Sequence, residues 1–112
     1  MFDQEEDFAQ SIREVAEMMS EAEIAVATTE ANLKRVIALT MLRGEHEGNK
    51  SAAAQSRFAD ASTEVYEARV QYGAARGKLA AAKVEFKARE IAFEHWRTKA
   101  ANLRMERKAY NA

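Results

Sequence analysis

The chain has 112 residues, no proline, no cysteine and a formal net charge of −1. This length is enough for one domain, and the absence of cysteine excludes a disulfide framework and a thiolate metal site. No apolar run approaches the ~20 residues of a membrane-spanning helix, and the acidic start at residues 3–7 argues against a signal peptide. Alanine is the commonest residue, with 24 copies. A chain rich in alanine, glutamate, lysine and arginine is typical of long helices and coiled coils.

The first helix is predicted over about residues 3–43. Asp3 followed by Glu6 resembles a capping box, and acidic side chains suit the positive end of a helix dipole. Apolar positions then recur in alternating steps of four and three, which is the heptad pattern of a coiled coil. We call these positions the first seam: Phe8, Ile12, Val15, Met19, Ala22, Val26, Thr29, Leu33, Val36 and Thr40.

The strongest turn signal in the chain lies at residues 44–50. This segment holds two glycines and an asparagine, residues that interrupt helices and favour turns. Gly44 suits a left-handed cap at the end of the first helix. Asn49 or Ser51 suits the cap that begins the next helix.

The second helix is predicted over about residues 51–109. Gly73 and Gly77 each cost it about 1 kcal/mol relative to alanine, but neither lies among other turn residues. We therefore predict that the helix is not interrupted there, and the sequence does not decide whether it bends. The second seam is Phe58, Ala61, Val65, Ala68, Tyr72, Ala75, Leu79, Ala82, Phe86, Arg89, Phe93, Trp96, Ala100 and Leu103.

A hairpin with its turn centred near Glu47 brings the two seams together. In such a hairpin, the sequence numbers of two facing residues add up to about 94. Large residues of the first seam then face alanines of the second: Leu33 with Ala61, Val26 with Ala68, Met19 with Ala75 and Ile12 with Ala82. Such matching fills space evenly. We therefore predict an all-α fold, a long antiparallel helical hairpin resembling a coiled coil, with residues 1–112 as a single domain.

A second apolar line lies on the opposite face of the second helix. A helix that is apolar on two faces needs two partners, and the hairpin supplies only one. Self-association follows, most simply as a homodimer that forms a helical bundle. The alternative is that these residues only raise helix propensity on a solvated face. We call this line the outer stripe: Val70, Ala74, Gly77, Ala81, Val84, Ala88 and Ile91.

The predicted register leaves residues 92–112 without a neighbour in the chain. Residues 94–112 carry a net charge of +3, and residues 1–30 carry −8. Cations interleaved with aromatic rings are a feature of nucleic-acid binding. Alternatively, Trp96 continues the seam and packs in an oligomer, and the cations pair with the acidic start of the first helix of a neighbouring copy. The candidate contact residues are Phe93, Trp96, Arg97, Lys99, Asn102, Arg104, Arg107 and Lys108.

The titratable residues do not form a recognisable catalytic or metal site. His46 and His95 are far apart, and neither has the second histidine four residues away that a helical zinc site uses. A hairpin offers little of the concavity that an enzyme needs. We therefore predict no catalysis, no metal and no cofactor.

Residues 42–106 resemble small all-helical proteins encoded by phages and prophages, often near genes for recombination and DNA metabolism. The similar segments are Leu42-Arg43, Glu47 to Ser51, Val65 to Ala68 and Ala101 to Glu106. The resemblance implies a helical hairpin in the cytoplasm of a bacterial host, with no activity to carry over. It singles out Asn102 and Arg104.

These observations favour a non-enzymatic, self-associating helical adaptor linked to DNA processing. One alternative is a direct nucleic-acid binder that uses residues 94–112. Another is an inhibitor of a host protein, in which the acidic first helix mimics a polyanion.

Overall fold

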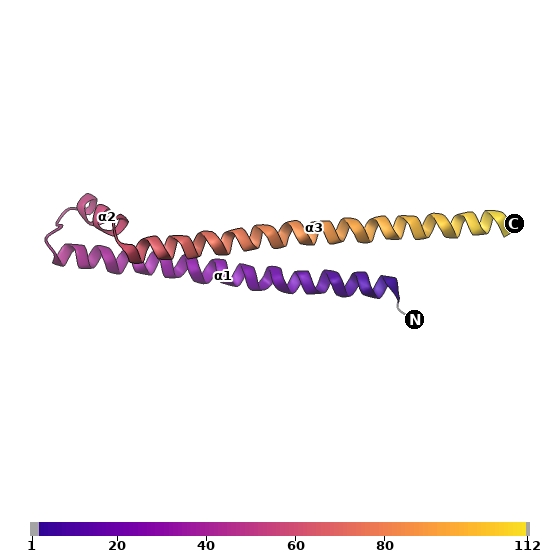
Figure 1. Ribbon diagram of the computed structural model, residues 1–112, viewed down its shortest axis with the longest axis horizontal. Coiled ribbons are helices and arrows are strands. Elements are labelled where there is room, and N and C mark those ends of the chain that lie inside the picture. Colours follow the sequence, from indigo (N-terminus) through magenta and orange to yellow (C-terminus); the bar gives the residue numbers. More distant parts are fainter. Residues whose placement is uncertain (1–2, 112) are drawn as a thin grey trace. The chain divides into compact units, whose positions relative to one another are not determined.

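The computed structural model describes residues 3–111, so Met1, Phe2 and Ala112 of the predicted domain lie outside it. Within this range the chain forms three helices and no strand: α1 at Gln4–His46, α2 at Ala52–Asp60 and α3 at Thr63–Asn111 (Figure 1). The predicted all-α, coiled-coil-like hairpin is confirmed, with α1 and α3 as its arms. The chain divides into two compact units, a terminal unit of Met1–Met19 with Ala81–Ala112 and a turn unit of Ser20–Ala80.

The helix α1 begins where predicted and ends three residues later than predicted. At its start, the Asp3 carboxylate accepts a hydrogen bond of 3.0 Å from the Glu5 N–H, which satisfies a free donor of the first turn. At its end, Gly44 lies inside the helix, so the predicted left-handed cap at Gly44 is wrong. The glycine with a positive φ is Gly48, at 104°.

A close contact explains why glycine occupies position 44. A Cβ added to Gly44 would lie 2.7 Å from Cδ1 of Phe58 and 3.2 Å from its Cβ. Gly44 therefore lets the Phe58 side chain lie directly on the backbone of α1. The Gly44 carbonyl accepts from both the backbone N–H and the side-chain amide of Asn49, each at 3.0 Å, which satisfies an acceptor at the helix end.

The predicted second helix is interrupted at Ala61 and Ser62, which separate α2 from α3. Ser51 caps α2 as predicted, because its hydroxyl accepts from the Ala54 N–H at 3.1 Å. Ser62 caps α3 in the same way, accepting from the Val65 N–H at 3.1 Å. A serine with a glutamate two residues later was therefore the missed start signal. Helix α3 continues through Gly73 and Gly77.

The two seams form most of the core, and Ala59 of α2 is buried outside them. Every residue of the first seam is buried or half-buried, and so is every residue of the second except Ala61 and Leu103. Val15 is fully buried in the terminal unit and Val65 nearly so in the turn unit. The seam hydroxyl of Thr40 donates to the Val36 carbonyl at 2.6 Å, so its burial leaves no polar atom unpaired.

The pairing of α1 with α3 differs from the predicted register by one heptad. In the predicted register, where the numbers of two facing residues add up to about 94, Phe8 lies opposite Phe86. In the structure, the ring of Phe8 packs on Phe93 instead. The turn and α2 occupy residues 47–62. Because this connection is longer than a simple turn at Glu47, the partner of each α1 residue lies further along α3.

None of the three helices combines, in residues 3–111, the length and the apolar character that crossing a membrane requires.

Candidate functional site: the exposed faces of α3

Three aromatic rings join α1 to α3 in the terminal unit. The Phe8 ring packs against both Phe93 and Trp96, with centroid distances of 5.7 and 5.6 Å. The rings of Phe93 and Trp96 are stacked, with centroids 6.1 Å apart. The Trp96 indole N–H donates to the side-chain oxygen of Gln4 at 2.7 Å. We call Phe8, Phe93 and Trp96 the aromatic cluster.

The aromatic cluster corrects the prediction that α3 has no neighbour from residue 92 onward. Phe93 and Trp96 both contact α1, and Ala100 is still half-buried. Just before them, Arg89 donates to the Ser11 carbonyl at 2.8 Å. Trp96 therefore packs on α1 of its own chain rather than in an oligomer, and the two aromatic candidates are not free contact residues.

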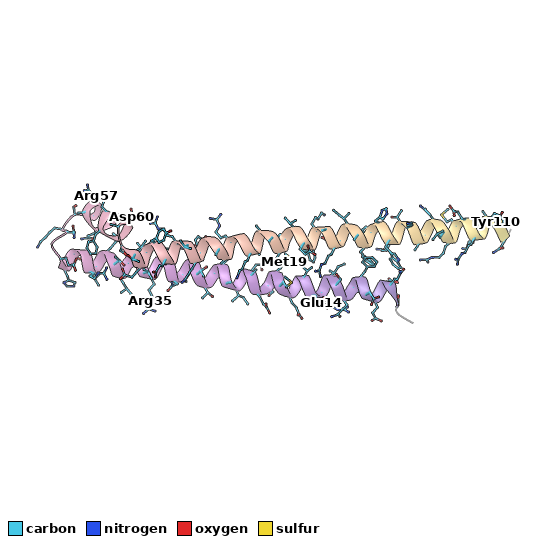
Figure 2. All side chains as sticks on the ribbon, viewed as in Figure 1. Glu14, Met19, Arg35, Arg57, Asp60 and Tyr110 are labelled. Atoms are coloured by element: carbon cyan, nitrogen blue, oxygen red, sulfur yellow. The ribbon has the colours of Figure 1, made fainter. Side chains whose placement is uncertain are left out.

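The polar candidates lie beside and beyond this cluster. The guanidinium of Arg97 stands 5.7 Å from the centroid of the Phe93 ring and 3.4 Å from the Glu94 carboxylate. Every residue in 101–111 is exposed, and Tyr110, near the end of α3 in Figure 2, is 95% exposed. We call residues 97–111 the basic segment; its exposed candidates are Arg97, Lys99, Asn102, Arg104, Arg107 and Lys108.

The outer stripe is exposed at every position. Its turn-unit members are Val70, Ala74 and Gly77, and its terminal-unit members are Ala81, Val84, Ala88 and Ile91. Val84 is 71% exposed and Ile91 is 59% exposed. Exposed apolar side chains that share one face of a helix are characteristic of an interaction surface. In each unit these residues thus face away from the partner segment of α1.

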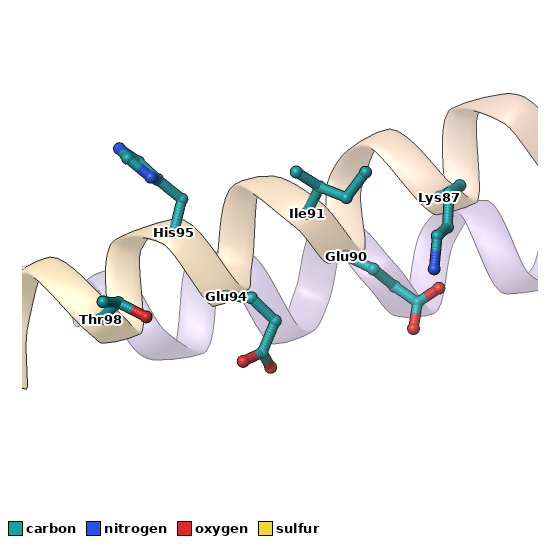
Figure 3. A pocket seen from close by; sticks show the side chains of 6 residues that line it. All are labelled: Lys87, Glu90, Ile91, Glu94, His95 and Thr98. Carbon is teal, nitrogen blue, oxygen red and sulfur yellow. The ribbon is translucent and has the colours of Figure 1, made fainter.

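A shallow groove surrounds Ile91 in the terminal unit. It has a volume of about 400 Å³ and charged side chains of both signs stand along it (Figure 3). Its walls are formed by Lys87, Glu90, Ile91, Glu94, His95 and Thr98. Because the groove is open and lies on the outer surface of a single helix, it suits an extended or helical partner better than a small molecule.

Among the remaining titratable groups, one ion pair in the turn unit changes the pKa of a carboxyl group. In the turn unit, the Arg43 guanidinium donates to the Glu64 carboxylate at 3.2 Å. This hydrogen bond, together with one of 3.0 Å from the Ser62 hydroxyl, lowers the pKa of Glu64 below its ordinary value. His46 and His95 are both exposed. Residues 3–111 bring no three metal-binding side chains together.

The exposed features of α3 are thus of two kinds. The outer stripe can be buried against another apolar face, and the basic segment can contact phosphate or carboxylate groups. The resemblance to phage-encoded proteins stays a prediction, because comparison with protein-family models, curated proteins and solved structures finds no match for this chain.

Proposed function

We propose that the protein is a non-enzymatic helical adaptor that self-associates, most simply as a dimer, through the outer stripe of α3. The observation that carries this proposal is the exposure of Val70, Val84 and Ile91 in a regular heptad pattern on the face opposite the second seam. Burying such a side chain contributes about 1.5–3 kcal/mol, and a twofold dimer buries two copies of every residue in its interface.

The pattern of the outer stripe supports a helical partner. Alanines recur at every seventh position, at 74, 81 and 88, and the positions between and beside them hold Val70, Gly77, Val84 and Ile91. The second seam has the same arrangement, with the buried alanines Ala68, Ala75 and Ala82, and it packs on a helix. A similar surface on the other side of α3 therefore suits another helix, and the four helices of a dimer form a bundle.

The adaptor role belongs, in this proposal, to the cytoplasm of a bacterial host and to DNA processing. Support for that setting comes from the resemblance of residues 42–106 to phage-encoded helical proteins. An adaptor of this kind brings partners together through its surfaces, and the basic segment leaves each copy with a further surface for a partner.

The experiment is to measure the mass in solution of wild type and two matched variants at tens of micromolar. Ile91→Glu places a charge in the outer stripe, and Ile24→Glu is the control, since Ile24 is 64% exposed on α1. Both substitutions leave the seams untouched. We expect a dimer for wild type and Ile24→Glu, and a monomer of unchanged helicity for Ile91→Glu. A monomeric wild type would refute the proposal.

A second candidate function is direct binding of nucleic acid. The observation that favours it is the full exposure of residues 101–111, where Arg104, Arg107 and Lys108 lie beside exposed Met105 and Tyr110. Cations supply salt-dependent attraction to phosphates, and an exposed ring can stack on a base.

Titration into labelled single- and double-stranded DNA at about 50 and about 200 mM salt tests this candidate. One variant changes Arg97, Lys99, Arg104 and Arg107 to Glu. The control changes Arg13, Arg35, Lys78 and Lys83 to Glu, so both variants have the same net charge. Binding that weakens steeply with salt and is lost only in the first variant would support nucleic-acid binding. Absence of binding at low salt would exclude it.

A further inference from the structure

Charged side chains beside the outer stripe indicate the orientation in which two copies of the chain associate. Lys87 and Glu94 are seven residues apart on one helix, so they lie on the same side of the stripe. Both line the groove around Ile91 (Figure 3). Within residues 3–111 no ion pair engages Lys87, and Glu94 has only the exposed contact of 3.4 Å with Arg97. The two side chains are thus available to a partner.

In an antiparallel pair of α3 helices, Lys87 and Glu94 of one copy each lie opposite a residue of the other sign on the second copy. When identical helices cross in opposite directions, the residues that flank the stripe on one side face the same flank of the other copy. Centred midway between positions 87 and 94, this arrangement sets Lys87 of each copy against Glu94 of the other. One twofold axis therefore creates two equivalent ion pairs.

The same register matches the apolar layers by size. At its centre, Ala88 of one copy meets Ile91 of the other, and the axis repeats this contact in reverse. Val84 meets His95, whose exposed ring lines the same groove. The small-to-large contact resembles the inner core, where alanines such as Ala82 are buried against α1, and it leaves no void between the helices.

A parallel pairing fits the stripe less well. In a parallel, in-register dimer, each residue faces the same residue of the other copy. Ala88 therefore faces Ala88, and Ile91 faces Ile91. Layers that are alternately narrow and wide do not pack evenly along straight helices. Lys87 would then face the uncharged Ala92, five residues further along, and only Glu94 would find an opposite charge, on Lys99.

We propose that two copies of this chain associate through antiparallel pairing of Ala81–Thr98 of α3, with Lys87 of each copy on Glu94 of the other. This inference rests on the proposed self-association and adds its orientation and register. In this dimer, the outer stripe of the second copy fills the groove around Ile91.

The test is a charge exchange between two variants, Lys87→Glu and Glu94→Lys. Each variant alone sets like charges at two places in its own dimer, so we expect its dissociation constant to rise about tenfold. An equimolar mixture of the two restores both ion pairs in the heterodimer. The double variant, which exchanges the charges within each chain, restores them in the homodimer. Both should associate as tightly as wild type.

The matched control is Lys83→Glu, an equal change of charge on α3 outside the stripe, which should leave the dissociation constant unchanged. If the wild type dimerises but the mixture and the double variant stay weak, the antiparallel register is wrong and the adaptor proposal stands. Sensitivity of Glu94→Lys without any effect of Lys87→Glu would instead indicate parallel helices. A wild type that is monomeric at every concentration overturns both proposals.

Discussion

The turn unit and the terminal unit hold the same two helices together in different ways. In the turn unit, α2 and its connections fix the geometry: Gly44 receives the Phe58 side chain, serines cap α2 and α3, and the ion pairs Arg43–Glu64 and Arg69–Asp60 join neighbouring elements. In the terminal unit no loop joins α1 to α3. Rings and two polar contacts, from Trp96 to Gln4 and from Arg89 to Ser11, hold the helices instead.

The difference shows where each unit is vulnerable. A loop lowers the entropic cost of bringing its two ends together, so the turn unit can rely on small, polar contacts. The terminal unit has no such help, and the area of its aromatic side chains must compensate. Substitutions should therefore be most costly at rings in the terminal unit and at the close contact of Gly44 in the turn unit.

The largest effect is expected for Phe8→Ala. Phe8 contacts both other rings of the aromatic cluster, and replacing a buried Phe by Ala costs about 3–5 kcal/mol. Because Phe8 is half-buried, we expect a loss of about 2 kcal/mol in the free energy of unfolding, measured by urea denaturation. Tyr110→Ala, at a 95% exposed position, is the control and should be neutral. Equal losses for the two variants would contradict the role of the cluster.

The next effect comes from a pair of glycine substitutions with opposite signs. Gly44→Ala forces the Phe58 side chain away, since Cγ and Cβ of Phe58 as well as Cδ1 lie within 3.2 Å of the new Cβ. Overpacking of this kind costs about 1–3 kcal/mol. Gly73→Ala meets nothing within 4 Å and should gain about 1 kcal/mol from helix propensity. Thermal unfolding of both variants measures the difference, and a Gly44→Ala protein as stable as wild type would refute the close contact.

The smallest effect concerns pH and the Arg43–Glu64 pair. Arg43 lowers the pKa of Glu64 in the folded chain below its ordinary value of 4.5, so the folded state favours the charged carboxylate. The resulting stability is present above pH 4.5 and is lost as the pH falls through the lowered pKa. Urea midpoints at about pH 7 and about pH 3 should therefore differ less for Glu64→Gln than for wild type. Glu67→Gln, also exposed on α3, should behave as wild type.

Heptad periodicity predicted most of the core, but it missed the buried Ala59 and included the exposed Ala61. The first seam repeats without a fault from Phe8 to Thr40, and each repeat adds independent support for one buried face. Residues such as Val15 and Ala82 therefore lie inside as predicted. The outer stripe was predicted as reliably, because two lines on opposite sides of one helix cannot both face α1.

The register and the break in the second helix depend on weaker signals. Ser62 is one serine in an alanine-rich stretch, and its capping role shows only in the hydrogen bond with Val65. Since the break changes the length of the connection, missing it shifted the partner of Phe8 by one heptad, from Phe86 to Phe93. The mistaken overhang at Phe93 and Trp96 followed from that shift. Within the basic segment, the predicted exposure is correct at every position except the half-buried Ala100.

The aromatic cluster also supplies a built-in spectroscopic reporter. Trp96 is the only tryptophan in the chain, and its indole lies against Phe8 with its N–H on Gln4. Its emission wavelength and its accessibility to a quencher therefore follow the opening of the terminal unit alone. Circular dichroism follows all three helices, so a difference between the two melting curves would show whether the units unfold in one step or in sequence.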